Sequence, residues 1–338
     1  MTFVFSCGIM NKKCQGDTTM ESKKIWAYLI HLGSNMWTKK GKAASGIRHE
    51  EDFTYKDKMF CQKETWTKVT NFLPSCGINT LIIDIGEGVR LDSHPEIAIE
   101  GAWSKEELRA ELERLRSIGL TPIPKFNFSC GHDAWMGEYA FMVGTKAYYN
   151  FCKDIVEETI ELFDTPEYFH LGLDEEDYGS QVTNYIAVVR TPAKKTEDAL
   201  FLFDICRTHG VRPWIWADFD SYGGVEKFSK VVPKDVVISS WHYGFVRDGA
   251  AIEDLPESVR MMKTIDDLGY ELVPATTTGW GWHLNSKETM LFCKKNITPQ
   301  NLKGFMVAPW MLTIEKKYYA MINDAYTFYN ARKDVFEE

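Results

Sequence analysis

The chain has 338 residues, of which 44% are hydrophobic and 26% are charged, so its composition is that of a globular protein with a large core and not that of a disordered chain. Its formal net charge is −9 and its lysines and arginines form no cluster. This argues against nucleic acid or an anionic lipid surface as the main partner, because both require a concentrated positive potential. No run of about eighteen apolar residues occurs, so we expect no membrane-spanning helix.

The first segment, residues 1–22, is expected to be a poorly ordered leader. It is apolar up to Cys7 but lacks the basic start and the long apolar stretch of a secretory signal. The sequence therefore favours a cytoplasmic location and leaves export or lipid anchoring of the N-terminus open. The eight cysteines lack the close spacing of a zinc or redox motif, so we expect reduced, mostly buried thiols.

From Ile25 onward, short apolar runs alternate with longer amphipathic segments, which is the pattern of repeated strand and helix units in a parallel sheet. One helix opens with a capping box, Ser104 with Glu107, and is followed by Gly119. The fold class is therefore α/β, and residues 23–338 are expected to form a single (β/α)8 TIM barrel that is the catalytic domain. Strands are predicted at Ile25–Leu32, Thr80–Ile85, Thr121–Phe126, Tyr168–Leu173, Arg212–Ala217, Val236–Ser240, Glu271–Ala275 and Gly304–Pro309, and helices at Ser104–Ser117, Lys146–Phe163, Glu197–His209, Pro256–Leu268 and Lys316–Tyr329.

In such barrels the chemistry lies at the carboxyl ends of the strands, where eight loops meet at one mouth. Aromatic rings beside carboxylates are the composition of a sugar site, because the C–H face of a pyranose packs on an indole while its hydroxyls bind charged groups. Taken singly, each strand-end residue could instead be a loop residue or a core aromatic. The ends offer His31, Asp84, Glu87, Arg90, Asn127, His132, Asp133, Asp218, Trp241, Tyr243, Trp280, Trp282 and Trp310.

The sharpest pattern is at residues 168–176, where the fourth strand runs into three consecutive carboxylates. Consecutive side chains on extended backbone point apart, so Asp174 and Glu175 would address two different atoms of one ligand. Acidic neighbours disfavour the ionised form of Glu175, which can then donate a proton to a glycosidic oxygen, while Asp174 orients a dipolar group beside the anomeric carbon. We predict that both residues are catalytic; the alternative is a strand-end cluster with a structural role.

An ordinary retaining glycosidase needs a second carboxylate about 5 Å from the acid to act as nucleophile. The ends of the sixth and seventh predicted strands, residues 240–242 and 274–278, contain no aspartate or glutamate. This absence favours substrate assistance, in which the carbonyl oxygen of a 2-acetamido group attacks the anomeric carbon while an aspartate holds the amide.

The fourth strand end resembles that of family 20 glycoside hydrolases, the β-N-acetylhexosaminidases. That family carries His-x-Gly-Gly-Asp-Glu at this place, and the chain has His170-Leu171-Gly172-Leu173-Asp174-Glu175. Upstream, residues 86–96 and 119–124 are similar to the stretch that leads to the family's Pro-Gly-His motif, which reads Cys130-Gly131-His132 here. The resemblance covers residues 78–178 best.

The resemblance implies retaining hydrolysis of a β-linked N-acetylhexosamine, GlcNAc or GalNAc, by substrate-assisted catalysis. Glu175 would be the general acid/base, Asp174 would orient the 2-acetamido group, and His132 would support the site. Trp241 and Trp310 would be walls of the sugar pocket, and Tyr243 would donate a hydrogen bond to the acetamido oxygen. Two features depart from the family: Leu173 replaces the second glycine of the motif, and the first strand, residues 25–32, lacks the arginine that grips the terminal sugar.

Other interpretations remain open. A non-catalytic or altered-specificity carbohydrate-binding barrel would keep the aromatic site without turnover, whereas a metal-dependent hydrolase is not supported by any His-x-His or His-Glu-x-x-His spacing. We therefore expect a carbohydrate substrate and neither a metal nor another cofactor; the oligomeric state is not indicated. His170, inside the strand, is expected to be a core histidine, and His132 with Asp133 forms either part of the mouth or a solvated loop.

Overall fold

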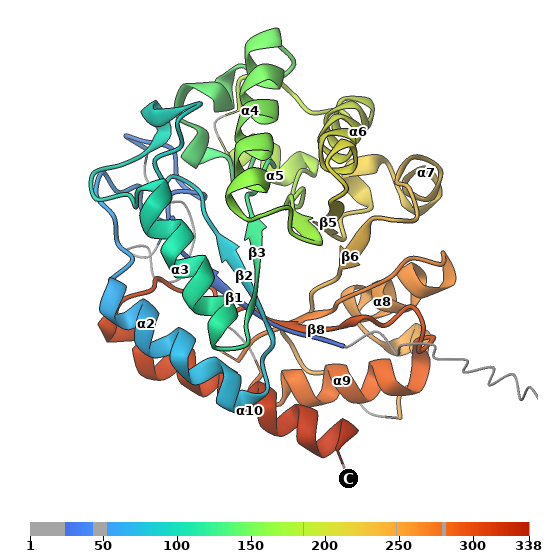
Figure 1. Cartoon of the computed structure of the whole chain (residues 1–338). Coiled ribbons are helices and arrows are strands. Elements are labelled where there is room, and N and C mark those ends of the chain that lie inside the picture. The colour runs from blue at the N-terminus through green and yellow to red at the C-terminus, as the bar shows by residue number, and fades with distance from the viewer. Residues whose placement is uncertain (1–23, 43–52, 185, 248, 279–281, 338) are drawn as a thin grey trace, which may run out of the picture.

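The computed structural model describes residues 24–42, 53–184, 186–247, 249–278 and 282–337. The predicted leader and Trp280 lie outside these ranges. Eight parallel strands form one sheet in the order β6-β5-β4-β3-β2-β1-β8-β7 (Figure 1). The strands are β1 Ile25–His31, β2 Thr80–Asp84, β3 Thr121–Lys125, β4 Tyr168–His170, β5 Arg212–Trp216, β6 Val237–Ser239, β7 Ala275–Thr276 and β8 Gly304–Val307.

The two ends of this sheet meet and close it into a barrel. Parallel bridges join Ile238 to Leu272 and Trp241 to Ala275, in and beside β6 and β7. All eight strands lie where apolar runs predicted them, and the single TIM barrel is confirmed. The prediction was least accurate for β7, which is only two residues long, because the chain from Leu272 onward pairs with its neighbours through isolated bridges.

Helices surround the strands on the outside (Figure 1). The predicted capping box of Ser104 and Glu107 is confirmed at the start of α3. Several boundaries were wrong. α6 begins at Pro192, five residues before the predicted start, because Thr191 caps it and Pro192 occupies its first turn. α10 ends at Phe336 and not at Tyr329, and β4 ends at His170 and not at Leu173, because the backbone turns left-handed at Gly172. The helices are α2 Lys63–Phe72, α3 Lys105–Ser117, α4 Lys146–Leu162, α5 Tyr178–Thr183, α6 Pro192–Thr208, α7 Val225–Val231, α8 Glu257–Asp267, α9 Asn285–Asn296 and α10 Tyr318–Phe336.

Alternation along the strands divides the apolar side chains into two cores. One set points outward and packs under the helices, and the other fills the barrel with residues such as Leu29, Ile82 and Trp214. His170 belongs to the interior: it is fully buried, as expected for a core histidine, and burial holds its pKa well below the usual value. The interior is therefore packed, and a ligand must bind above it.

Two further expectations concern the chain as a whole. The six cysteines in the described residues are free thiols and all are buried, as predicted. Among the described helices, none combines the length and the apolar character that crossing a membrane requires.

Candidate functional site

The turn that follows β4 carries the acidic cluster on an unusual backbone. Gly172, Leu173 and Glu175 have φ angles of +70°, +65° and +52°. A Cβ atom on Gly172 would lie 2.2 Å from Oδ1 of Asn127, so this position requires glycine. Left-handed backbone at leucine and glutamate costs on the order of 1 kcal/mol per residue, so neighbouring contacts must hold the turn.

Asp174 is held by a residue at the end of the neighbouring strand. Its Oδ1 atom accepts a hydrogen bond of 2.8 Å from Nδ2 of Asn127. The Oδ1 atom of Asn127 accepts from the backbone N–H of Leu173 at 3.3 Å and from the hydroxyl of Ser129 at 2.5 Å. Asn127 therefore ties the end of β3 to the turn after β4 and fixes the orientation of the Asp174 carboxylate.

Glu175 projects in a different environment, with 54% of its side chain exposed. Its Oε2 atom lies 3.5 Å from Nε2 of His132, and Nδ1 of His132 lies 3.2 Å from the Ser129 hydroxyl. Partial burial raises the pKa of Glu175; His132 opposes this effect, and nearby carboxylates, Asp174 foremost, add to it. Glu175 is therefore suited to carry a proton and to exchange it with a ligand.

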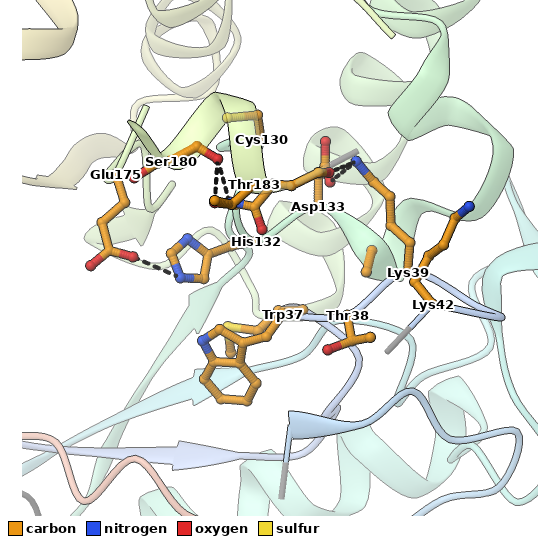
Figure 2. Close-up of a pocket in the computed structure, with 14 residues that line it drawn as sticks. Trp37, Thr38, Lys39, Lys42, Cys130, His132, Asp133, Glu175, Ser180 and Thr183 are labelled. Carbon is orange, nitrogen blue, oxygen red and sulfur yellow. Dashed lines mark hydrogen bonds and ion pairs between the residues drawn. The ribbon is translucent and has the colours of Figure 1, made fainter. Parts of the chain in front are cut away.

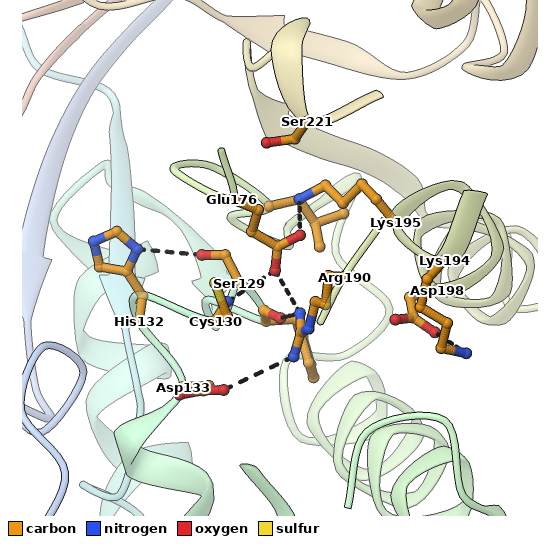
Figure 3. A network of polar contacts seen from close by, with 12 residues as sticks. Ser129, Cys130, His132, Asp133, Glu176, Arg190, Lys194, Lys195, Asp198 and Ser221 are labelled. Carbon is orange, nitrogen blue, oxygen red and sulfur yellow. Dashed lines mark hydrogen bonds and ion pairs between the residues drawn. The ribbon is translucent and has the colours of Figure 1, made fainter. Parts of the chain in front are cut away.

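Glu176, the third carboxylate, is only 2% exposed and points toward Arg190 and Lys195 (Figure 3). Its carboxylate pairs with Arg190 and with Nζ of Lys195 at 2.7 Å, and it accepts a hydrogen bond of 2.8 Å from the backbone N–H of Cys130. Burial alone would raise the pKa of Glu176, but the two cations lower it below the usual value. The sequence pattern did not reveal these partners.

Asp133 is also buried, with 2% exposure, so the solvated-loop interpretation is wrong for this residue. Its carboxylate lies 3.2 Å from Nζ of Lys39 and 3.8 Å from Nη2 of Arg190. Burial raises the pKa of Asp133 to about 6 despite these cations. The loop after β3 is therefore anchored by charge and is not free in solvent.

Three predicted aromatic residues come together above the barrel interior. The half-buried indoles of Trp241 and Trp310 pack against Trp216, with ring centroids 5.9 and 5.8 Å from it. Nε1 of Trp310 donates a hydrogen bond of 2.9 Å to the hydroxyl of Tyr243. Burial raises the pKa of Tyr243 far above its usual value, so its hydroxyl keeps a proton that it can donate.

The remaining predicted residues are spread around this centre, and their ligand-binding roles stay predictions. Trp282 is 38% exposed and adjoins the Tyr243 loop, because its backbone N–H donates to the Tyr243 carbonyl at 3.1 Å. Asp218 is half-buried and accepts a hydrogen bond of 3.2 Å from the backbone N–H of Glu176. The side chain of Arg90 is exposed, and its backbone N–H donates to Trp103 at 2.9 Å.

The ends of β1, β2 and β3 place a buried ionic cluster next to Trp310. Oδ2 of Asp84 lies 3.4 Å from Nδ1 of His31 and 2.5 Å from Nζ of Lys125. Burial opposes ionisation of Asp84, but Lys125 and His31 lower its pKa to about 2. The ring of His31 lies 5.8 Å from that of Trp310. The sequence analysis placed Lys125 inside a strand and not at the mouth. Its pairing with Asp84 follows from the register of β2 and β3 in the barrel.

A cavity of about 200 Å³ opens beside Glu175 and His132. Figure 2 shows these two residues at one end and Lys39 with Lys42 at the other. The ring of Trp37, which the sequence did not single out, packs edge-on against Phe53 at 4.4 Å. Most of the wall is polar, which suits a hydroxyl-rich ligand; it includes Thr38, Ser180, Thr183 and Asn184.

His132, Asp174 and Glu175 each offer one ligand atom, and these atoms lie within 4.8 Å of one another. One imidazole nitrogen and two carboxylate oxygens are donors that a divalent cation accepts. Oδ1 of Asp174 already accepts a hydrogen bond from Asn127, which competes with coordination through that atom. These three donor atoms make a metal-dependent hydrolase an alternative that removal of metal ions can test.

Comparison with solved structures shows which fold this site is built on. The barrel is similar to the β-N-acetylhexosaminidase from Bacteroides fragilis, with 13% identity and a TM-score of 0.62, over 90% of this chain and 65% of that one. It is similar to the pneumococcal virulence factor StrH with 15% identity and a TM-score of 0.61, over 93% of this chain and 84% of that one. It is also similar to the family 20 β-N-acetylhexosaminidase from Streptomyces coelicolor, with 11% identity and a TM-score of 0.59, over 91% of this chain and 64% of that one. No protein-family model and no curated protein sequence matches the chain significantly. The fold is therefore that of family 20 enzymes, and the chain spans slightly less than two thirds of two of these relatives.

Proposed function

We propose that this chain is a retaining β-N-acetylhexosaminidase that uses substrate-assisted catalysis, with residues 23–338 as its catalytic domain. The observation that carries the proposal is the contrast between two adjacent carboxylates. Asp174 is buried and bound to an amide donor, whereas Glu175 is half-exposed with a raised pKa. Two carboxylates in such different environments suit two different roles in one reaction.

In the first step Glu175 donates its proton to the glycosidic oxygen as the bond from that oxygen to the anomeric carbon breaks. The carbonyl oxygen of the substrate's 2-acetamido group forms the new bond to the anomeric carbon, which gives an oxazolinium ion and a free alcohol. Asp174 accepts a hydrogen bond from the acetamido N–H and stabilises the positive charge that develops there. Tyr243 donates its hydroxyl proton in a hydrogen bond to the acetamido oxygen and orients it for attack.

In the second step the Glu175 carboxylate takes a proton from water, and the water oxygen attacks the anomeric carbon from the face that the leaving group vacated. The bond to the acetamido oxygen breaks, the 2-acetamido group is restored, and the product keeps the β configuration. His132, 3.5 Å from Glu175, stabilises the carboxylate in this step whenever its imidazole is protonated. One residue thus serves first as acid and then as base.

The sugar itself would lie against Trp241 and Trp310, whose indoles are half-buried above the barrel interior. Next to Trp310, the strand ends carry the buried cluster of His31, Asp84 and Lys125. The first strand lacks the arginine that the family uses to grip the terminal sugar, so recognition of that sugar relies on other groups. The similarity to solved family 20 barrels supports the reaction class. The missing arginine bears on which sugar is bound and not on the reaction class.

The test is release of 4-nitrophenol from a panel of α- and β-glycosides with and without the 2-acetamido group. We expect cleavage only of 2-acetamido β-glycosides, and Asp174→Asn should reduce that cleavage strongly. Equal cleavage of glycosides that lack the acetamido group would contradict substrate assistance. Sugar binding without any turnover would favour the non-catalytic carbohydrate-binding barrel.

A second candidate is metal-dependent hydrolysis, which the grouping of His132, Asp174 and Glu175 favours. In that case dialysis against a chelator abolishes activity and added Zn²⁺ or Mn²⁺ restores it. Activity that is unaffected by a chelator excludes this candidate and leaves the three side chains to the acid/base chemistry above.

A further inference from the structure

The two residues at the end of the cavity share a feature of sequence. His132 is followed directly by Asp133, and Glu175 is followed directly by Glu176. Both following carboxylates are 2% exposed, and both face the same arginine, Arg190 (Figure 3). One buried guanidinium therefore connects the loop after β3 with the turn after β4.

Arg190 is fixed at both its side chain and its backbone. Its Nη1 atom donates to Glu176 and, at 2.6 Å, to the carbonyl of Phe128, while Nη2 lies 3.8 Å from Asp133. The side chain of Gln181 accepts from the Arg190 N–H at 2.8 Å and donates to the carbonyls of Arg190 and Glu176, each at 2.8 Å. These contacts leave the guanidinium little freedom to move.

The surrounding charges alternate and extend the connection in both directions. Lys39 pairs with Asp133 on one side, and Lys195 pairs with Glu176 on the other. All five side chains are buried, with Lys39 the most exposed at 7%. Removing one partner from a buried pair is far more damaging than removing an exposed one, because the remaining charge stays without compensation.

We propose that Arg190 is a positioning residue that sets the distance between Glu175 and His132. It acts through Glu176 and Asp133 and does not touch the substrate. Glu175 stands on a left-handed backbone, with φ +52°, that needs support from its neighbours, and its carboxylate lies 3.5 Å from His132. Nη1 of Arg190 makes the hydrogen bonds to Glu176 and Phe128, while Nη2 faces Asp133 as an ion pair at 3.8 Å. The extended guanidinium thus faces both carboxylates, whereas the ammonium of lysine is a single point charge.

The first test does not require activity. Glu175 is titrated by carbon NMR in four full-length proteins: the wild type, His132→Gln, Arg190→Lys, and the double variant. Because His132 opposes the rise in the pKa of Glu175, His132→Gln should raise that pKa in the wild-type background. We expect a clearly smaller rise in the Arg190→Lys background. An equal rise in both backgrounds would overturn the proposal, because the two side chains would then keep their spacing without Arg190.

The second test rests on the proposed function. It compares kcat/KM of Arg190→Lys on phenyl and 2,4-dinitrophenyl 2-acetamido-β-glycosides, since a phenolate needs a proton on leaving and a dinitrophenolate hardly does. We expect a loss of about tenfold or more for the phenyl substrate and less than about threefold for the other, because general acid catalysis contributes at least about a hundredfold. Equal losses on both substrates would mean a general structural role and would overturn the proposal.

Two variants keep these tests decisive. Arg207→Lys lies near the other end of α6 and alters a partly exposed pair with Asp235, so it should change neither the titration nor the rates. If Arg190→Lys does not fold, Asp133→Asn removes one of the two carboxylates that Arg190 faces and should show the same dependence on the leaving group. A wild type that cleaves neither substrate contradicts the proposed function, while the titration still decides the role of Arg190.

Discussion

The side-chain amide of Asn127 donates a hydrogen bond of 2.8 Å to Oδ1 of Asp174 and connects the end of β3 with the turn after β4. The other end of the same amide accepts the backbone N–H of Leu173, one residue before Asp174. Asn127 thus orients the Asp174 carboxylate and also holds the backbone that carries it. The residue never needs to contact a substrate to affect the reaction.

Replacing Asn127 by alanine should therefore reduce turnover of 2-acetamido β-glycosides. Leaving a buried group without its partner costs about 1–3 kcal/mol. If this cost raises the free energy of the transition state, the rate falls by roughly 5- to 150-fold. Steady-state kcat/KM measures it. Asn71→Ala, which removes an exposed amide bound to Arg114, is the control and should leave the rate unchanged.

Glu175→Gln should nearly abolish cleavage of substrates with poor leaving groups. We expect a loss of about 10²- to 10⁴-fold in kcat/KM for a phenyl glycoside, because the amide cannot donate the required proton, and a much smaller loss for a dinitrophenyl glycoside. The ratio of the two losses is the measurement. Full activity of this variant on the phenyl glycoside would remove Glu175 from the role of acid.

The pH dependence should follow from the raised pKa of Glu175. Its acid form is needed in the first step, so kcat/KM falls as the pH rises through this pKa, and any change that raises the pKa moves the fall to higher pH. His132 opposes the rise, so His132→Gln should shift the falling limb upward. A downward shift in the measured profile, or none, would contradict the influence of His132 on the acid.

Gly172→Ala should be much more damaging than the same change at Gly210. Both glycines have left-handed φ angles, +70° and +73°, so both variants lose about 1 kcal/mol to backbone strain. Only at Gly172 does the new Cβ meet an atom, Oδ1 of Asn127 at 2.2 Å, whereas nothing lies within 4 Å at Gly210. Denaturant unfolding should show the larger loss of stability at Gly172, accompanied by loss of activity.

Asp324→Asn should stabilise the protein at neutral and higher pH. Asp324, in α10, is 2% exposed, and burial raises its pKa to about 7. Because this folded-state pKa lies above the unfolded value of about 3.9, the stabilising protonated form is fully present below about pH 4 and is lost as the pH rises through 7. We expect a gain of about 1–3 kcal/mol in the free energy of unfolding at pH 8, and no gain near pH 4.

The control for this prediction is Asp334→Asn, which alters an exposed ion pair with Lys287. Its effect on the free energy of unfolding should stay below about 1 kcal/mol at every pH, since exposed pairs contribute little. A pH-independent gain for Asp324→Asn would show that the gain comes from packing and not from titration.

Much of the fold could be predicted from the sequence because buried parallel strands are nearly continuous apolar runs. Thr80–Asp84 and Arg212–Trp216 are such runs, and both were predicted to within one residue. The start of α6 was misplaced because its first turn contains two lysines and no apolar period; Thr191 followed by Pro192 was the available signal.

The sequence could point to candidate site residues only where they follow a predicted strand. Asp174 and Glu175 lie in the turn directly after β4 and could be identified as a pair. Arg190 and Lys125 could not, since the carboxylates that they bind lie 14 and 41 positions away in the sequence. Periodicity reports the environment of a residue and says nothing about a partner on another loop.

The bridge between Trp241 and Ala275 has a consequence for ligand binding. It is one of the two bridges that join the segments of β6 and β7, so the residue proposed as a sugar wall also belongs to the seam that completes the ring. A sugar packed on this indole would bind the protein with its barrel closed between β6 and β7, and not a form in which the two strands have separated. Occupancy of the site and integrity of the barrel are then thermodynamically linked, so substrate should slow amide hydrogen exchange along this seam more than elsewhere.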